Sequence, residues 1–327
     1  MNIKYATSEM GFEGYFPVNY PNLRVLETQL LYLEAYHLPI HKILNDGKTY
    51  KGSILYNIGK GGFEKPYISD LYHNYHNVVS LLQEKFDEIY IYQDGEIGWW
   101  NQVDTRLQAW WYNQLRASNG ILVPNSTDIP FYKGLFPDKE IKVIRSVMTD
   151  EGLDKTKFKP QENRTIVTGP LTREYNGFSQ VLIAHNADMP IDIPPMGESR
   201  MPKDSWEMAP NLGINYLNYM SWVDWMYNLS RYKIGYMMSA ATASGSFALN
   251  CAYLGIPCIA YDNVNTQKYL HPDLSVSDGD IEQARKLATR LANDNDFYIE
   301  CSNKAKKNFN ELYSEKVFLD KFKKLNV

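Results

Sequence analysis

The chain has 327 residues, 44% of them hydrophobic and 22% charged, which is typical of a folded protein long enough for two domains. Its formal net charge of −4 argues against a broadly basic surface that coats nucleic acid. The three cysteines, Cys251, Cys258 and Cys301, cannot all pair and lack metal-ligand spacing, so we expect buried thiols in a reducing compartment. With no signal-peptide pattern and no apolar run of membrane-spanning length, the chain is expected to be cytoplasmic.

Strands and helices are predicted to alternate through the first 150 residues. The predicted strands are 2–6, 40–44, 53–58, 88–93, 120–124 and 140–144, and the predicted helices are 23–36, 70–85 and 102–117. This alternation predicts a doubly wound α/β domain, a parallel sheet with helices on both faces, over residues 1–150.

A polar segment, 151–163, has no apolar periodicity and is interpreted as a linker. The alternation then restarts, which predicts a second α/β domain over 164–305. Its predicted strands are 164–168, 190–194, 213–217, 234–238 and 256–261, and the predicted helices are 178–187, 221–231, 247–254, 281–292, 297–313 and 315–325.

The stretch SAATASGSFALNCAYLGIPCIAYD (239–262) is the most informative part of this second half. A small-residue loop enters Ser244-Gly245-Ser246 and opens an apolar helix, where free backbone N–H groups and the helix dipole favour a phosphate or diphosphate. An ordinary capped helix packed on a sheet fits the stretch equally well. If the functional interpretation holds, Gly245→Leu is expected to abolish diphosphate binding while the fold survives.

Dinucleotide binding of the dehydrogenase type is disfavoured. The G-x-G-x-x-G pattern is absent after Ala6, where the chain reads TSEMGFEG, and after Thr168, where it reads GPLTREYNG.

Several segments, in order, resemble the donor-binding half of GT-B glycosyltransferases of the group 1 type. They are the strand ending at Thr168-Gly169 with Arg173 and Asn176-Gly177 behind it, the segment YMSWVDWMYNLS (219–230), the loop, helix and GIP strand of 244–259, and the terminal pair of helices. The resemblance implies two Rossmann-like domains that face a cleft, with residues 306–327 packing back on the first domain.

The resemblance also implies a function and a donor site. The function is transfer of a sugar from a nucleoside-diphosphate sugar, with a UDP-sugar favoured, to an acceptor hydroxyl, without a tightly bound cofactor. The donor-binding residues would be Thr168, Gly169, Arg173, Asn176, Gly177, Ser244, Gly245 and Ser246. Retaining members usually carry a Glu where 240–249 has no acid, so an inverting reaction is slightly favoured.

An inverting reaction needs a base on the acceptor side. Asp94 ends the strand EIYIYQ and is the first choice, with Glu96 as the alternate, although Asp-Gly is more often only a turn. Acceptor-binding candidates are Glu9, Gly11, Glu13, Trp99 and Trp100, for which solvated loop charges and core aromatics are the alternatives. No metal is assigned, because His73 and His76 have no third ligand nearby in sequence.

Other functions stay open at this point. A nucleotide-sugar epimerase or hydrolase would need a histidine near the donor, and the second half offers only His185 and His271. A non-catalytic nucleotide-sugar-binding protein is the third reading. The acceptor is a glycan, a lipid-linked sugar or a hydroxymethylated DNA base, since similar compact enzymes of phages glucosylate DNA. The expected state is a monomer or weak dimer, in the host cytoplasm if a phage encodes it.

Overall fold

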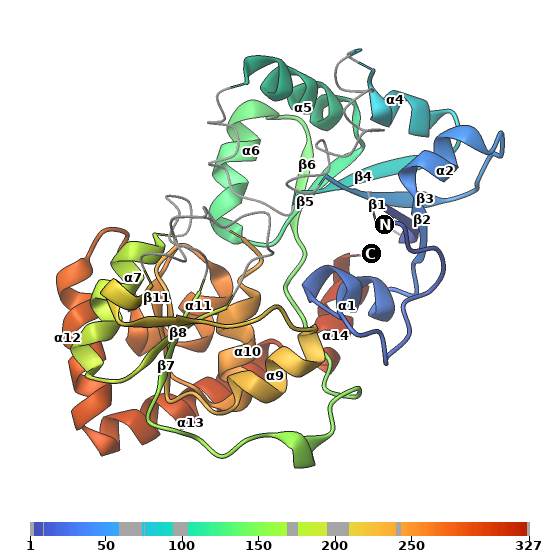
Figure 1. The fold of residues 1–327 in the computed structure, drawn as a ribbon. Helices are drawn as coiled ribbons and strands as arrows, with labels where there is room; N and C mark the ends of the chain where they lie inside the picture. Colours follow the sequence, from blue (N-terminus) through green and yellow to red (C-terminus); the bar gives the residue numbers. More distant parts are fainter. Residues whose placement is uncertain are drawn as a thin grey trace.

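The computed structural model describes residues 3–8, 10–58, 74, 76–93, 104–168, 176–194, 209–239 and 243–325. These residues form two six-stranded parallel sheets, one from the chain before residues 151–163 and one from the chain after them (Figure 1). The first, in the order β2-β1-β3-β4-β5-β6, contains β1 (Ile3–Ser8), β2 (Tyr36–Pro39), β3 (Ser53–Asn57), β4 (Glu88–Tyr92), β5 (Gly120–Val123) and β6 (Glu140–Val143). The second, in the order β12-β11-β10-β7-β8-β9, contains β7 (Thr165–Val167), β8 (Ile191–Ile193), β9 (Ile214–Tyr216), β10 (Ile234–Met237), β11 (Cys258–Tyr261) and β12 (Ser275–Val276). The predicted pair of doubly wound α/β sheets is confirmed.

Helices connect the strands and cover the sheets. They are α1 (Val25–Tyr32), α2 (Ile40–Asn45), α4 (Val78–Gln83), α5 (Thr105–Ala117), α6 (Ile129–Leu135), α7 (Gly177–Ala184), α9 (Trp222–Leu229), α10 (Ser246–Leu254), α11 (Asn265–Leu270), α12 (Ile281–Asn293), α13 (Asn295–Leu312) and α14 (Glu315–Leu325). None of these described helices combines the length and apolarity needed to cross a membrane.

The last helix returns to the first domain, as expected. The Tyr32 hydroxyl of α1 donates a hydrogen bond to Glu315 of α14 (3.1 Å), and the rings of Tyr32 and Phe318 lie 6.3 Å apart. In Figure 1 α14 accordingly lies beside α1. The domain boundaries at 150, 163 and 305 stay predictions.

One predicted strand is wrong. Residues 40–44 belong to the helix α2, and the strand is β2, which ends at Pro39. Ile40 and Ile43 are both buried, and a spacing of three residues puts them on one face of a helix. The apolar residues of this segment therefore follow the helical period, which a run of only five residues did not reveal.

The apolar helix predicted after Gly245 is confirmed as α10. Its residues from Phe247 to Ala252 are all buried, because α10 packs between β10 and β11 on one side and α13 on the other. Gly255 ends it in the left-handed conformation (φ 73°), the usual role of glycine at a helix C-terminus. Cys251, Cys258 and Cys301 are free and buried, as expected.

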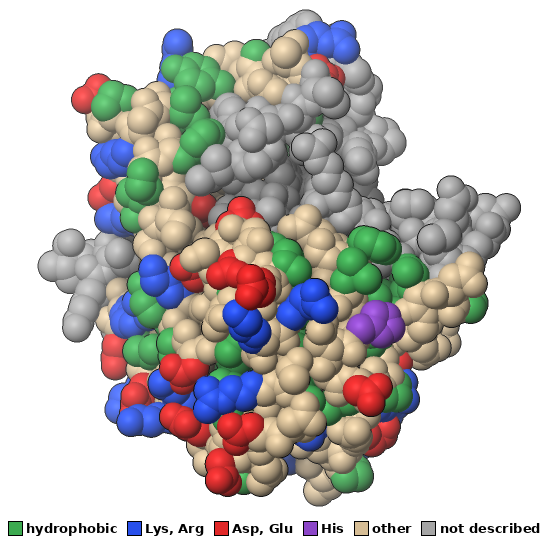
Figure 2. Space-filling model, turned by 90° about the vertical axis from the view of Figure 1, so that its left-hand side faces the viewer, with side chains coloured by type: hydrophobic (Ala, Val, Ile, Leu, Met, Phe, Trp, Pro, Cys, Tyr) green, Lys and Arg blue, Asp and Glu red, His purple; other side chains and the backbone are tan. Residues whose placement is uncertain are grey.

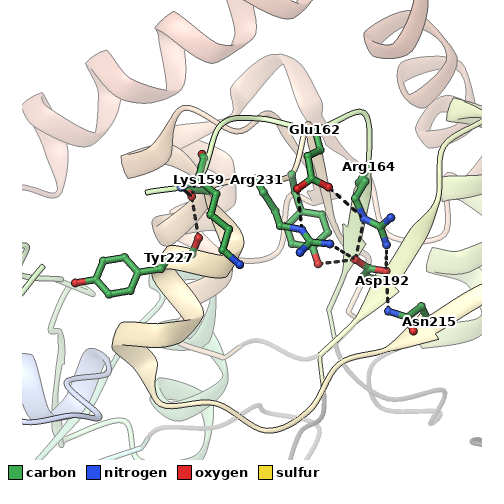
Figure 3. A network of polar contacts seen from close by, with 9 residues as sticks. Lys159, Glu162, Arg164, Asp192, Asn215, Tyr227 and Arg231 are labelled. Atoms are coloured by element: carbon green, nitrogen blue, oxygen red, sulfur yellow. Dashed lines mark hydrogen bonds and ion pairs between the residues drawn. The ribbon is translucent and has the colours of Figure 1, made fainter. Parts of the chain in front are cut away.

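A buried ionic network fixes the amino ends of the second sheet (Figure 3). Asp192 of β8 is fully buried and accepts hydrogen bonds from Arg164 (2.5 Å), the Tyr232 hydroxyl (2.6 Å) and Asn215 (3.2 Å), with Arg231 at 3.7 Å. Arg164 and Arg231 precede β7 and β10, so the network lies at the edge opposite the carboxyl ends of those strands. Arg164 and Arg231 thus balance the charge of the Asp192 carboxylate, and the network has a structural role away from the carboxyl ends of the strands.

Candidate functional site

The second sheet reverses its strand order between β7 and β10, and the carboxyl ends of strands at such a point are where doubly wound sheets bind ligands. Thr168 follows β7 there, and its N–H is held by the Tyr236 carbonyl (2.9 Å) and the Gln180 side chain (3.1 Å). Asn176 donates from its side chain to the Met238 carbonyl after β10 (3.0 Å). The predicted donor residues Thr168, Asn176 and Gly177 thus lie at the reversal point.

Two helices begin at this point without a side-chain cap. Asn176 precedes α7 in the left-handed conformation (φ 48°) and uses its side chain on Met238, and Gly245 precedes α10 and has no side chain. The helices α4, α5, α9, α12 and α13 begin with a capping Asn, Asp or Ser, whereas α1, α2, α6 and α11 also lack a side-chain cap. What distinguishes α7 and α10 from the other uncapped helices is that they follow β7 and β10, the two strands between which the second sheet reverses its order. The first-turn N–H groups of α7 and α10 have no acceptor within the described ranges, and together with the helix dipoles they favour an anion.

Gly245 has a structural role that the sequence did not reveal. Its φ is 67°, and a Cβ there would lie 1.9 Å from Thr266 Oγ1 and 2.6 Å from Val264 Cγ1. Thr266 also donates to the Gly245 carbonyl (3.0 Å). The loop is thus pressed against the start of α11, and the expectation that Gly245→Leu leaves the fold intact is wrong, because the new side chain enters packed structure.

The first domain contacts this loop directly. Asn125, after β5, donates to the Ala243 carbonyl (2.8 Å), and the Ser146 hydroxyl donates to the Ser244 carbonyl. The Ser126 hydroxyl donates to the side chain of Asn265 at the start of α11 (2.9 Å). The carboxyl edge of the first sheet therefore faces the predicted diphosphate loop across the domain interface. Sequence reasoning missed Asn125 and Ser146, although a polar residue just after the buried strand GILVP was the available signal.

The loop after β1, which carries the predicted acceptor residues, is held by a buried histidine. Burial lowers the pKa of His37, so the ring is neutral. Its Nδ1–H donates to the Phe12 carbonyl (2.7 Å), so Nε2 accepts from the Ser8 hydroxyl (2.9 Å). Gly14 pairs with the His37 backbone in both directions (3.0 Å each).

This loop contains two of the predicted acceptor residues. A Cβ on Gly11 would have open space around it, whereas Glu13 is exposed and forms an ion pair with Lys42 (2.5 Å). The first sheet reverses its strand order between β1 and β3, so Gly11 lies near the corresponding reversal point of its own sheet. Glu13 is engaged by Lys42 at the surface, whereas the space beside Gly11 is open to a ligand.

The remaining predicted site residues, Glu9, Asp94, Glu96, Trp99, Trp100, Gly169 and Arg173, lie outside the described residues, and their roles stay predictions. Gln93, directly before Asp94, is described and fully buried. Its Oε1 accepts from Trp111 Nε1 (2.7 Å), and its Nε2 has no hydrogen-bond partner within the described part of the chain. Trp111 is core, as the sequence favoured, and fixes the strand end that leads into Asp94.

The outer face of the second domain mixes opposite charges (Figure 2). On α12, Lys286 pairs with Glu282 (2.6 Å) and Arg290 with Asp294 (3.2 Å). A polyanionic acceptor is better matched to an unneutralised basic surface than to these pairs. Across the described ranges, no three His, Cys, Asp or Glu side chains gather closely enough to hold a metal ion.

No family model and no curated protein matches the sequence. Solved structures do match in fold. A TarM variant from S. aureus, in complex with fondaparinux, alpha-GlcNAc-glycerol and UDP, superposes with a TM-score of 0.61 at 13% identity over 84% of this chain and 55% of that one. The chain thus spans about half the length of TarM.

Two further structures match over more of their own length. An alpha-glucosyltransferase in complex with UDP-glucose and DNA containing an abasic site gives a TM-score of 0.56 at 12% identity, over 89% of this chain and 86% of that one. A trehalose-6-phosphate synthase, studied for glycosyltransfer with retention, gives a TM-score of 0.61 at 10% identity, over 83% of this chain and 72% of that one. At these identities the likeness concerns the fold.

Proposed function

We propose that this chain, which has the GT-B fold, is a glycosyltransferase that moves a sugar from a nucleoside-diphosphate sugar to an acceptor hydroxyl. The observation that carries the proposal is the pair of helices, α7 and α10, that begin without side-chain caps where the second sheet reverses its strand order. Their N–H groups and dipoles suit a diphosphate, whose charge grows as it leaves the sugar. The UDP and UDP-glucose complexes among the fold neighbours support UDP as the nucleotide.

An epimerase or hydrolase finds less support. Of the two histidines that such chemistry would use, His271 is fully buried with its Nε2 on the Ala248 carbonyl (3.0 Å), and His185 contacts the Leu212 carbonyl (2.9 Å). Neither histidine of the second half is therefore placed to act as the acid or base that an epimerase or hydrolase would need.

Ser246 allows a sharp test of the diphosphate site. It is the exposed first residue of α10, where Asp is favourable to the helix but places a negative charge at the predicted diphosphate. Ser246→Asp should weaken UDP binding at least about tenfold, because a contacting like charge costs more than about 1.4 kcal/mol near a protein surface. Ser246→Asn, equal in size but neutral, is the control, and calorimetric titration is the measurement. Equal affinities for UDP in the two variants would refute this site.

Arg173 is proposed to meet the leaving diphosphate, from its position between β7 and α7 in the sequence. Arg173→Ala should lower turnover by more than it weakens nucleotide binding, because the charge it meets grows in the transition state. Equal losses of kcat and of UDP affinity would contradict that role.

The stereochemistry of the reaction is proposed to be inverting, with Asp94 as the base and Glu96 as the alternate. The support is the lack of an acid in 240–249, whereas the relation to a retaining trehalose-6-phosphate synthase argues the other way. Asp94→Asn should retain UDP binding and lose transfer by about 10²–10⁴-fold, the usual contribution of a positioned base. NMR of the product measures its anomeric configuration. A product with the same configuration as the donor would refute the inverting mechanism.

The acceptor is to be found by screening glycans and lipid-linked sugars against DNA that contains hydroxymethylated bases. Two fold neighbours support these classes, since TarM was solved with alpha-GlcNAc-glycerol and the alpha-glucosyltransferase with DNA. UDP release that rises only when an acceptor is added identifies transfer. UDP release from a UDP-sugar at the same rate without any acceptor contradicts it.

A further inference from the structure

Asn125 links the two domains through both ends of its side chain. It follows β5 of the first sheet and is 1% exposed. Its Nδ2 donates to the Ala243 carbonyl (2.8 Å), and its Oδ1 accepts from the Asn265 N–H (2.9 Å). One side chain of the first domain therefore holds two segments of the second domain that are 22 residues apart in the sequence.

The two segments are the predicted diphosphate loop and the surface on which it packs. Ala243 directly precedes Ser244-Gly245-Ser246, and Asn265 begins α11, next to Val264 and Thr266, against which Gly245 is pressed. Asn125 therefore fixes the loop relative to its support.

The contact also orients the peptide groups of the loop. Asn125 engages the Ala243 carbonyl and Ser146 the Ser244 carbonyl. In a trans peptide the N–H points opposite to the C=O, so the N–H groups of Ser244 and Gly245 point away from these two first-domain donors. Neither N–H has an acceptor among the described residues. They thus extend the set of free donors that begins with the first turn of α10.

We propose that Asn125 is a positioning residue for the donor, supplied by the domain opposite the donor site. By holding the Ala243 carbonyl, it presents the Ser244 and Gly245 N–H groups, together with those of α10, to the diphosphate of the bound nucleotide. This inference rests on the proposed function and adds that the diphosphate site is complete only when both domains build it.

Asn125→Asp separates the two contacts. A carboxylate still accepts from the Asn265 N–H, but it has no N–H to donate to Ala243. One carboxylate oxygen then faces the Ala243 carbonyl oxygen, and the two repel each other. Thr127→Val is the matched control: it removes another interdomain hydrogen bond, from the Thr127 hydroxyl to the Asn263 carbonyl (3.1 Å), which touches neither Ala243 nor Asn265. Asn125→Leu, similar in size and uncharged, replaces the Asp variant if the buried charge prevents folding.

The experiment is calorimetric titration of UDP with donor kinetics on the full chain. We expect the Asn125 variant to bind UDP about tenfold or more weakly and to raise the donor KM by a similar factor. Its kcat should fall as well, because the N–H groups that Asn125 positions meet a charge that grows as the diphosphate leaves the sugar. Thr127→Val should stay within about twofold in UDP affinity. Equal UDP affinity in the Asn125 and Thr127 variants overturns the inference.

Hydrogen exchange distinguishes failure of this inference from failure of the proposed function. A wild-type chain that binds no nucleotide refutes the function. In that case the exchange of peptide 243–250 without ligand still tests Asn125: faster exchange in the Asn125 variant than in Thr127→Val supports its hold on the loop, and equal exchange overturns it.

Discussion

Replacing Gly245 by alanine should destabilise the protein far more than the same change at Gly279. Both glycines have a left-handed backbone, with φ 67° and 82°, so both variants incur the cost of about 1–2 kcal/mol for a Cβ in that region. At Gly279 nothing lies within 4 Å of the new Cβ, so this is the whole effect.

At Gly245 two further costs follow from the packing. The Cβ would overlap Thr266 Oγ1 at 1.9 Å and Val264 Cγ1 at 2.6 Å, and both neighbours are β-branched, so they have little rotamer freedom to move away. Overpacking of this kind costs about 1–3 kcal/mol, and loss of the hydrogen bond from Thr266 to the Gly245 carbonyl about 1 kcal/mol. The total is about 3–6 kcal/mol, so Gly245→Ala should exceed Gly279→Ala by about 2–4 kcal/mol.

Urea unfolding followed by tryptophan fluorescence measures both variants against wild type. The reasoning is refuted if the two alanine variants lose the same free energy of unfolding, because the loop would then not be pressed on α11. A folded Gly245→Ala with wild-type stability and weakened UDP binding would show that Gly245 serves ligand binding and not the packing of the loop.

Three further outcomes are expected. His271 stays neutral when folded because burial lowers its pKa to about 4, while the unfolded chain takes up the proton below pH 6.5. Its contribution is therefore complete above pH 6.5. Between pH 6.5 and 4 the free energy of unfolding should fall by about 3 kcal/mol more in wild type than in His271→Gln, because the buried His37 contributes its own slope to both proteins. Asp192→Ala removes the buried carboxylate from the half-buried Arg164 and Arg231 and leaves the buried Tyr232 hydroxyl without its acceptor, so it should cost about 3–5 kcal/mol in urea. Glu162→Gln, at 47% side-chain exposure, should cost under about 1 kcal/mol; similar losses would contradict the role of a buried carboxylate. Trp111→Phe removes the donor to Gln93 Oε1 and should lower the thermal midpoint through a loss of about 1–3 kcal/mol, and an unchanged midpoint would show that this bond is dispensable.

The sequence by itself determined the class of fold and the general place of the donor site. Short apolar strands alternate with periodic helices in both halves, and this local pattern sufficed for two doubly wound sheets. The helix α10 and its strand β11 were readable because Gly245 and Gly255 bound an apolar run. The pattern failed at residues 40–44, where five residues were too few to separate a helix from a strand.

Only the tertiary structure decided what surrounds that site. Asn125 and Ala243 are 118 residues apart, and their hydrogen bond depends on how the two sheets face each other, which no local period encodes. Thr266 presses on Gly245 for the same reason, from a helix that the sequence did not predict. Propensity and periodicity act over a few residues, whereas contacts across the domain interface follow from the packing of completed elements.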